Sequence, residues 1–333
     1  MGGNALKNVT TRRYQAAEYS QLERDVCVML RKHFPASVSL MPILYYRNKE
    51  SFGDLDILVS SDNLPNDWQD GVAALLQSKE VVRNGNVVSF EHKEFQIDLI
   101  ATPTEDFVVA DKYFAYNDLG NLLGRLANSM GLKLGHQGLF YNWQEGTEKY
   151  HTAVLTKDWG LILRVLGLDL AHYRAGFDTL EDIFEFVASS RFFNPAIYLL
   201  ANRNNRDRVR DEKRKTYMEF LGWCARLEQP YPTRYPDKES YLPYLFEMIP
   251  GFQELDTQVR AKWERSKRLK AVFNGNIVGE ATGLSGKELG AFMQWFKETT
   301  EGFVDRMLAM NPEVVPGWIA YRYEGYKQQK GLK

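Results

Sequence analysis

Cysteine is scarce in this sequence. Its 333 residues include only two, Cys27 and Cys224, which are far apart and lack the short spacings of a zinc site. Two such thiols predict neither a disulfide framework nor a structural metal, and they fit a reducing cytoplasm. Apolar runs are short as well: none approaches the roughly 18 residues that span a membrane, and no signal peptide is recognisable. We therefore expect a cytoplasmic protein without a membrane partner.

Charge of one sign is not in excess either. With 26% charged residues and a formal net charge of -1, the chain lacks an overall basic character, so any surface that binds nucleic acid must be local. The hydrophobic fraction of 44% is that of a globular protein, and the length allows two or three domains. Met1–Leu6 begins like an acylation motif but has Leu6 where Ser or Thr is preferred, which predicts no lipidation.

Two short alternating segments carry the clearest chemical signal. In Gly53–Val59 side chains alternate between faces of an extended strand, so Asp54 and Asp56 point one way while apolar residues point into a core. The segment Phe95–Ile100 alternates in the same manner and places Asp98 opposite its apolar face. If the two strands are neighbours, roughly 4.8 Å apart, three carboxylates converge on one polar patch.

Three carboxylates at this separation repel one another unless a cation lies between them. Such all-oxygen donors suit Mg²⁺ or Mn²⁺, and two ions about 4 Å apart can activate a hydroxyl and stabilise a leaving pyrophosphate. An Asp-x-Asp pair also occurs on solvated edge strands without any metal. The apolar embedding, the preceding Gly53 and the second apolar strand with Asp98 favour a metal site here.

Apolar periodicity divides the chain into an α+β part and a helical part. We expect strands within residues 37–46, 53–59, 81–83, 87–90, 95–100 and 132–141. We expect helices within residues 18–34, 68–76, 107–130, 158–166, 179–188, 195–200 and 206–227, with further helices over 245–333. Asn84-Gly85 predicts a hairpin, Gly131 a helix stop, and residues 231–244, rich in proline, a linker or irregular cap.

Two helical runs concentrate positive charge. The first run contains Arg203, Arg206, Arg208, Arg210, Lys213, Arg214 and Lys215. The second contains Arg260, Lys262, Arg265, Lys267, Arg268 and Lys270. Such runs are usually solvated helix faces, but beside a polymerase-type metal site they favour contacts with a phosphate backbone.

These residues resemble the polymerase beta nucleotidyltransferase superfamily, in particular the X-family DNA polymerases. The segment Tyr46–Val59 resembles the family's arginine-bearing turn and Gly-Asp-x-Asp strand, and Ile97-Asp98-Leu99 is similar to its third-carboxylate strand. Tyr113–Asn121 resembles the family's Tyr-Phe pair with its Asp and Asn. The resemblance extends through the 131–140 hairpin and the helix at 163–168, and covers roughly residues 20–170.

The resemblance implies an α+β fold with a nucleotidyltransferase palm at 1–106, a thumb-like subdomain at 107–190 and a helical nucleic-acid-binding domain at 191–333. It also implies roles for individual residues. Asp54 and Asp56 would bind two Mg²⁺ or Mn²⁺ ions, Asp98 would bind the catalytic ion, Arg47 would hold the triphosphate, Tyr113 and Phe114 would pack the sugar, Asp118 and Asn121 would face the base, and Arg125 would lie near a templating base.

One departure from the family concerns the triphosphate. The family has a Gly-Ser pair about ten residues before the carboxylates, and Ile43 and Leu44 stand there in this chain, without the open backbone approach of glycine. We hypothesise that Gly2 and Gly3, with Asn4, fold back to supply backbone amides, aided by Lys7 or Arg12. The alternative is a disordered leader. The family's lyase module has no counterpart, so lyase activity is not expected.

A second resemblance lies in the C-terminal part. Residues 273–290 are similar to the tail-side motif of CCA-adding enzymes and bacterial poly(A) polymerases, in which a glycine-rich turn introduces a helix. The amides of Ser285–Leu289 could hold a phosphate, or the glycines could form only a tight turn. This tail points to an RNA 3′ end, including that of a tRNA, whereas the polymerase-like part points to DNA.

The expected function is metal-dependent transfer of a nucleoside monophosphate from an NTP or dNTP to a nucleic-acid 3′ hydroxyl. Two alternatives remain open at this point. One is nucleotidyl transfer onto a protein or small-molecule hydroxyl, which enzymes usually shorter than this chain perform. The other is a degenerate nucleic-acid-binding protein without catalysis, an alternative that the intact carboxylates weaken.

Overall fold

The computed structural model describes residues 5–228 and 237–331. Gly2 and Gly3, the hypothesised phosphate anchor, lie outside the described residues, as does much of the expected linker at 231–244. The chain divides into two compact units, Met1–Phe252 and Gln253–Lys333, and each is described by itself. The domain boundaries expected near residues 106 and 190 both fall inside the first unit.

A five-stranded mixed sheet forms the first part of the first unit, with strand order β2-β4-β7-β6-β5. Its strands are β2 (Leu40–Pro42), β4 (Asp54–Ser60), β5 (Val81–Asn84), β6 (Val87–His92) and β7 (Phe95–Thr102). Strands β4 and β7 are parallel neighbours and the other pairs are antiparallel. The predicted α+β class and the adjacency of the two carboxylate strands are confirmed.

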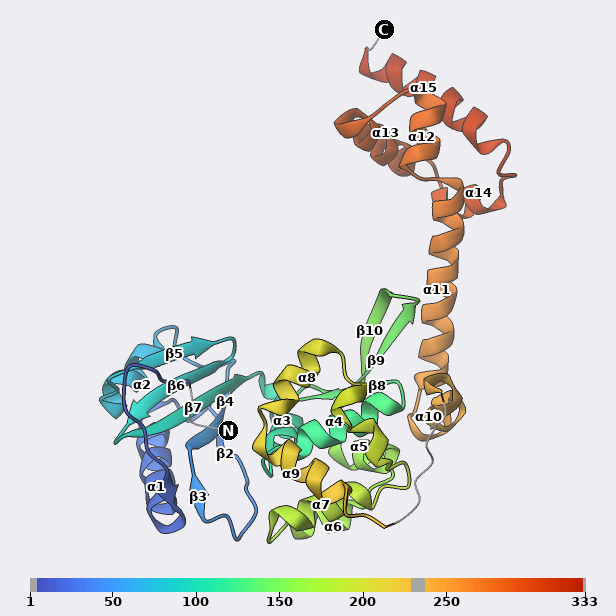
Figure 1. Ribbon diagram of the computed structural model, residues 1–333. Coiled ribbons are helices and arrows are strands. Elements are labelled where there is room, and N and C mark those ends of the chain that lie inside the picture. Colours follow the sequence, from blue (N-terminus) through green and yellow to red (C-terminus); the bar gives the residue numbers. More distant parts are fainter. Residues whose placement is uncertain (1–4, 229–236, 332–333) are drawn as a thin grey trace. The chain divides into compact units, whose positions relative to one another are not determined.

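The two faces of this sheet differ in chemistry because side chains alternate along each strand. On one face Leu55, Ile57 and Val59 are fully buried against α1 (Ala16–His33) and α2 (Trp68–Leu76), which lie beside the sheet in Figure 1. The other face carries the aspartates, and farther along the strands Leu58 and Ile100 pack against α3 (Phe107–Phe114). The aspartates therefore lie where the apolar cover of this face ends.

The hairpin of β5 and β6 is confirmed, with its turn one residue later than predicted. Asn84 pairs with Val87 in the ladder, so Gly85 and Asn86 form the turn, and Gly85 has a φ of 62° that favours glycine. The strand expected over 37–46 is shorter than predicted. Only Leu40–Pro42 pairs with β4.

Helices and a three-stranded antiparallel sheet, β10-β9-β8, make up the rest of the first unit. The strands are β8 (Leu132–Gly135), β9 (Gly138–Glu145) and β10 (Glu148–Thr156). The helices are α4 (Leu119–Ser129), α5 (Trp159–Val165), α6 (Leu170–Ala175), α7 (Leu180–Ala188), α8 (Asn205–Glu212), α9 (Lys215–Cys224) and α10 (Leu242–Met248), with short 3-10 turns at Thr104–Asp106, Pro195–Ile197, Leu200–Asn202 and Lys238–Tyr241. Two short strands, β1 (Tyr14–Gln15) and β3 (Ser51–Phe52), pair separately.

The secondary structure of the second unit, within its described residues, consists of helices without strands, as predicted from the sequence. Its helices are α12 (Gly275–Thr282), α13 (Gly286–Thr299), α14 (Phe303–Ala309) and α15 (Val315–Lys330), and α11 (Phe252–Val272) leads into it. Phe292, Phe296 and Ile319 form the centre of its core. Gly283 ends α12 in the left-handed conformation, which makes the predicted turn before α13. Among the described residues no helix is long and apolar enough to cross a membrane.

Candidate metal centre

Three carboxylates from two adjacent parallel strands form the candidate site. Strand β4 provides Asp54 and Asp56, and β7 provides Asp98, which is the register partner of Asp56. One oxygen from each of these side chains lies within 4.8 Å of the others. Asp98 is only 8% exposed. The convergence that the alternating sequence predicted is therefore present.

Without a cation, burial and mutual repulsion disfavour the charged forms of these carboxylates. Burial raises the pKa of Asp56 well above its usual value, and the negative charges of Asp54 and Asp98 raise it further. Burial also raises the pKa of Asp98 to about 6, with a contribution from Asp54, while hydrogen bonds from Ser89 and Gln96 oppose this rise. Asp56 and Asp98 thus bind a proton more tightly than solvated carboxylates do, and a cation would relieve the repulsion.

The donor set fits a hard divalent cation. All three side chains offer carboxylate oxygens, which Mg²⁺ and Mn²⁺ prefer, and softer nitrogen or sulfur donors are absent from this cluster. The raised pKa values of Asp56 and Asp98 also fit a binding site, because burial of neighbouring carboxylates is unfavourable unless a positive charge compensates them. The residues present are therefore suited to hold Mg²⁺ or Mn²⁺.

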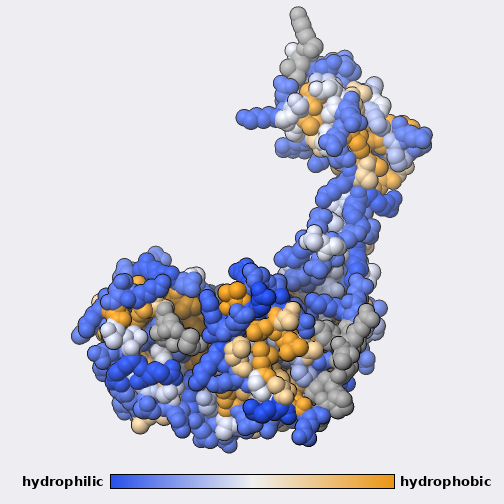
Figure 2. All heavy atoms as spheres, viewed as in Figure 1, coloured by the Kyte–Doolittle hydropathy of each residue, from blue (hydrophilic) through white to orange (hydrophobic). Residues whose placement is uncertain are grey.

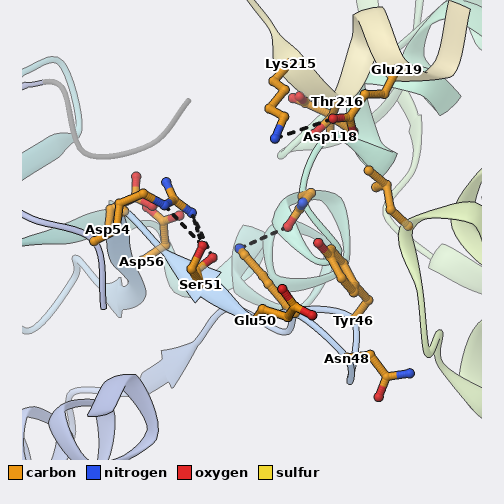
Figure 3. Close-up of a pocket in the computed structure, with 15 residues that line it drawn as sticks. Tyr46, Asn48, Glu50, Ser51, Asp54, Asp56, Asp118, Lys215, Thr216 and Glu219 are labelled. Atoms are coloured by element: carbon orange, nitrogen blue, oxygen red, sulfur yellow. Dashed lines mark hydrogen bonds and ion pairs between the residues drawn. The ribbon is translucent and has the colours of Figure 1, made fainter. Parts of the chain in front are cut away.

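A cavity of about 560 Å³ lies beside Asp54 and Asp56. Figure 3 shows these two aspartates on one side and Asp118, Lys215 and Glu219 on the other. The acidic side chains that line the cavity are Glu50, Asp54, Asp56, Asp118 and Glu219, and the basic ones are Arg13, Lys49 and Lys215. The cavity thus combines a candidate metal centre with cations that face the same space.

Lys49 lines the cavity, and no role was expected for it from the sequence. Its ammonium group donates a hydrogen bond to Asn117 Oδ1 at 3.2 Å and lies 4.6 Å from the centre of the Phe52 ring. Burial lowers the pKa of Lys49, and the charges of Asp54 and Asp56 oppose this effect. A buried ammonium group beside two carboxylates is a typical feature of a functional site.

Arg13 is a second cation of the cavity without a role assigned from the sequence. Its guanidinium group donates to the carbonyl oxygen of Ser51 at 2.8 Å and to Ser51 Oγ at 3.1 Å. These bonds hold Arg13 just before β4, on the approach to Asp54. Only tertiary structure brings this residue, from the start of the chain, to the cavity.

Arg47, expected to hold a triphosphate, does not line the cavity. Its guanidinium group forms an ion pair with Asp178 and donates to the carbonyl oxygen of Ala175 at 2.9 Å. The backbone N–H of Arg47 also donates to Phe177. Arg47 therefore fastens the loop before β3 to residues 175–178.

The residues expected to contact sugar and base are only partly brought together. Asp118 lines the cavity and forms an ion pair with Arg214. Asn121 is half-buried, and its Nδ2 has no hydrogen-bond partner among the described residues. Tyr113 and Phe114 are not lining residues, and the Phe114 ring stacks on His136 with centroids 5.7 Å apart.

Arg125, expected near a templating base, is buried in an ionic cluster. It donates to Asp211 at 2.7 Å and to Asp207 at 3.2 Å, and Asp211 is fully buried. Arg203 is buried beside the same Asp211, at 3.7 Å. The first basic run therefore supplies an internal network as well as surface, and the helix expected over 206–227 is divided into α8 and α9 near Arg214.

Comparisons with known proteins add little to this geometry. No family model and no curated protein sequence matches the chain. A solved structure of polymerase beta from Leishmania infantum, a ternary complex with primer and template, matches 41% of this chain and 62% of its own, with 15% identity and a TM-score of 0.34. The chain thus matches less than two thirds of that polymerase's length. A match with so low a TM-score and identity carries no functional argument.

Proposed function

We propose that this protein is a metal-dependent nucleotidyltransferase that adds a nucleoside monophosphate, from an NTP or dNTP, to the 3′ hydroxyl of a nucleic acid. The observation that carries the proposal is the cluster of Asp54, Asp56 and Asp98 beside a cavity lined with cations. Two bound Mg²⁺ or Mn²⁺ ions would supply Lewis-acid stabilisation of the attacking and leaving oxygens.

The carboxylates have separate roles in this proposal. Asp54 and Asp56 would hold both ions, and Asp98 would hold the catalytic one. The 3′ oxygen forms a bond to the α-phosphorus, the bond between that phosphorus and the bridging α–β oxygen breaks, and pyrophosphate leaves. The proton of the 3′ hydroxyl passes to the carboxylate of Asp98.

Side-chain cations replace the missing Gly-Ser pair in our proposal. The backbone N–H of Ile43 donates to the backbone carbonyl oxygen of Asp56 at 3.0 Å, so it is already used in the sheet. Arg13, Lys49 and Lys215 face the cavity and are suited to contact the phosphates. Five carboxylates line the same cavity, so a bare triphosphate would be repelled. We therefore expect the nucleotide to bind only with divalent cations. The contribution expected of Gly2 and Gly3 remains part of the hypothesis.

The acceptor is a nucleic acid in this proposal, with DNA, RNA and tRNA ends all open. The palm, thumb-like and helical parts would correspond to residues 1–106, 107–190 and 191–333. Asp118 and Asn121 would face the base, since Asp118 lines the cavity and the amide of Asn121 retains unused hydrogen-bonding capacity. Tyr113 and Phe114 would reach the sugar from the start of the same segment.

The test is incubation with Mg²⁺ or Mn²⁺, each labelled triphosphate, and primed DNA, single-stranded DNA or tRNA. We expect label on a nucleic acid, and we expect Asp98→Asn to lose turnover by a factor of at least a hundred while it keeps nucleotide binding. The control is Asp70→Asn, because Asp70 is exposed, pairs with exposed Arg83 and does not line the cavity. Label on the protein itself, or no label on any acceptor, would contradict the proposal.

A further inference from the structure

Gln96 is a buried polar residue at the metal centre with no role in the chemistry above. It is 2% exposed, is the register partner of Asp54 and lies on the same strand face as Asp98. Its Nε2 donates to both carboxylate oxygens of Asp98, at 3.0 and 2.9 Å. Its Oε1 accepts a hydrogen bond from the backbone N–H of Ala5 at 2.9 Å. One side chain thus connects the third carboxylate with the N-terminal segment.

The orientation of this amide is dictated by its two partners. An ionised carboxylate only accepts hydrogen bonds and a backbone N–H only donates them. The Nε2 group of Gln96 must therefore face Asp98, and Oε1 must face Ala5. If the amide turned over, its oxygen would lie against a carboxylate and its NH₂ against a donor, both unfavourable in a buried site. Asp98 and Ala5 therefore favour the same orientation of the Gln96 amide.

The N-terminal segment Ala5–Tyr14 is itself held at several points outside the metal centre. Glu80 accepts hydrogen bonds from the backbone N–H of Lys7 at 3.0 Å and of Asn8 at 2.8 Å, and from Asn8 Nδ2 at 2.8 Å. Farther along, the hydroxyl of Tyr14 donates to the carbonyl oxygen of Lys93 at 2.6 Å. Of these hydrogen-bonding contacts, those of Glu80 hold the residues that follow Ala5 most closely. Glu80 itself lies outside the cavity lining.

We propose that Gln96 is a positioning residue that couples the N-terminal segment to Asp98. The segment, anchored on Glu80, presents the N–H of Ala5 to Gln96, and Gln96 holds the Asp98 carboxylate in the orientation that the attacking hydroxyl requires. For catalysis this inference rests on the proposed nucleotidyl transfer. Its structural part, that the metal centre depends on residues far from it, can be tested without turnover.

The experiment compares Glu80→Ala, Gln96→Leu and the double variant in the full chain, with Asp70→Ala as the control for loss of one exposed ion pair. We expect kcat to fall about fivefold in Glu80→Ala and about tenfold or more in Gln96→Leu, with little change in KM for the nucleotide. The double variant should be no slower than Gln96→Leu, because both changes disturb one linkage. Glu80→Gln keeps an acceptor oxygen for the N–H donors and should recover part of the loss.

Two results would overturn the inference while nucleotidyl transfer stands. In the first, Glu80→Ala has the same kcat as Asp70→Ala while the kcat of Gln96→Leu is low. The N-terminal segment then has no effect on Asp98. In the second, the losses multiply in the double variant. If the wild-type protein transfers no nucleotide, the binding of Mn²⁺ alone tests the linkage. Weaker Mn²⁺ affinity in both single variants, without a further loss in the double variant, supports the linkage. Unchanged affinity refutes it. Thermal unfolding identifies any variant that fails to fold, in which case Glu80→Met, which has no acceptor oxygen, replaces Glu80→Ala and Gln96→Met replaces Gln96→Leu.

Discussion

Replacement of Lys49 with methionine removes a buried cation from the cavity and keeps a side chain of similar length. A phosphate oxygen about 4 Å from the ammonium group would gain about 4 kcal/mol at an effective dielectric constant of 20. Loss of hydration and the neighbouring Arg13 and Lys215 reduce this value. Hydrogen bonds to charged groups contribute about 1.5–3 kcal/mol net, so we expect nucleotide affinity to fall about tenfold to hundredfold in Lys49→Met.

The same substitution should have a different effect on the metal ions. Lys49 lowers the pKa of Asp56 and repels cations, so its removal should leave the affinity for Mn²⁺ alone unchanged or higher. The assay is equilibrium binding of Mn²⁺, and then of a non-hydrolysable nucleotide analogue in the presence of Mn²⁺. Lys32→Met, at an exposed position of α1, is the matched control. Unchanged nucleotide affinity in Lys49→Met would refute the role of Lys49, and weaker Mn²⁺ binding would refute the electrostatic reasoning.

Three further predictions concern other parts of the molecule. Because burial raises the pKa of Asp98 to about 6, Mn²⁺ must displace a proton at low pH, so Mn²⁺ affinity should rise from pH 5 to 7. For the same reason the stability of the metal-free protein should fall as the pH rises from about 4 through 6, and a titration with constant Mn²⁺ affinity would contradict this. Arg125→Ala leaves Asp211 as a buried charge with weaker compensation and should lower the free energy of unfolding by about 3–5 kcal/mol in denaturant titrations, whereas a change below 1 kcal/mol would refute the buried pairing. Lys262→Gln with Arg268→Gln, on the largely hydrophilic surface of α11 in Figure 2, should reduce the salt dependence of nucleic-acid binding by about two charges, and an unchanged slope would exclude α11 from the interface.

The cluster of Asp54, Asp56 and Asp98 could be predicted because the residue pattern that defines each strand lies within a few positions. Alternation along two apolar segments places Asp54, Asp56 and Asp98 on one face, and the only tertiary assumption was that the two strands are neighbours. That assumption is confirmed by the pairing of Asp56 with Asp98. The helices α1 and α2 and the hairpin at Gly85 were predictable for the same reason, since their apolar periodicity and turn residues lie within a few positions.

The surroundings of the metal centre could not be predicted, because they depend on distant partners. Lys49 reaches the cavity beside Asn117, which is 68 residues away, whereas the resemblance implied a role for Arg47 and none for Lys49. A run of arginines does not reveal that Arg125 and Arg203 share the buried Asp211. Strand β10 also escaped prediction, because most of its side chains are exposed or half-buried and show no apolar alternation.

We propose that Asp54, Asp56 and Asp98 catalyse transfer of a nucleoside monophosphate to a 3′ hydroxyl. A direct test compares triphosphates labelled at the α- or γ-phosphorus, with acceptors that end in a 3′ hydroxyl or a 3′-deoxy nucleotide, in the presence of Mg²⁺ or Mn²⁺. We expect that only the α label enters the acceptor, only when a 3′ hydroxyl is present, and not with Asp98→Asn. Transfer of the γ label, transfer to the 3′-deoxy end, or α label found only on protein would contradict it.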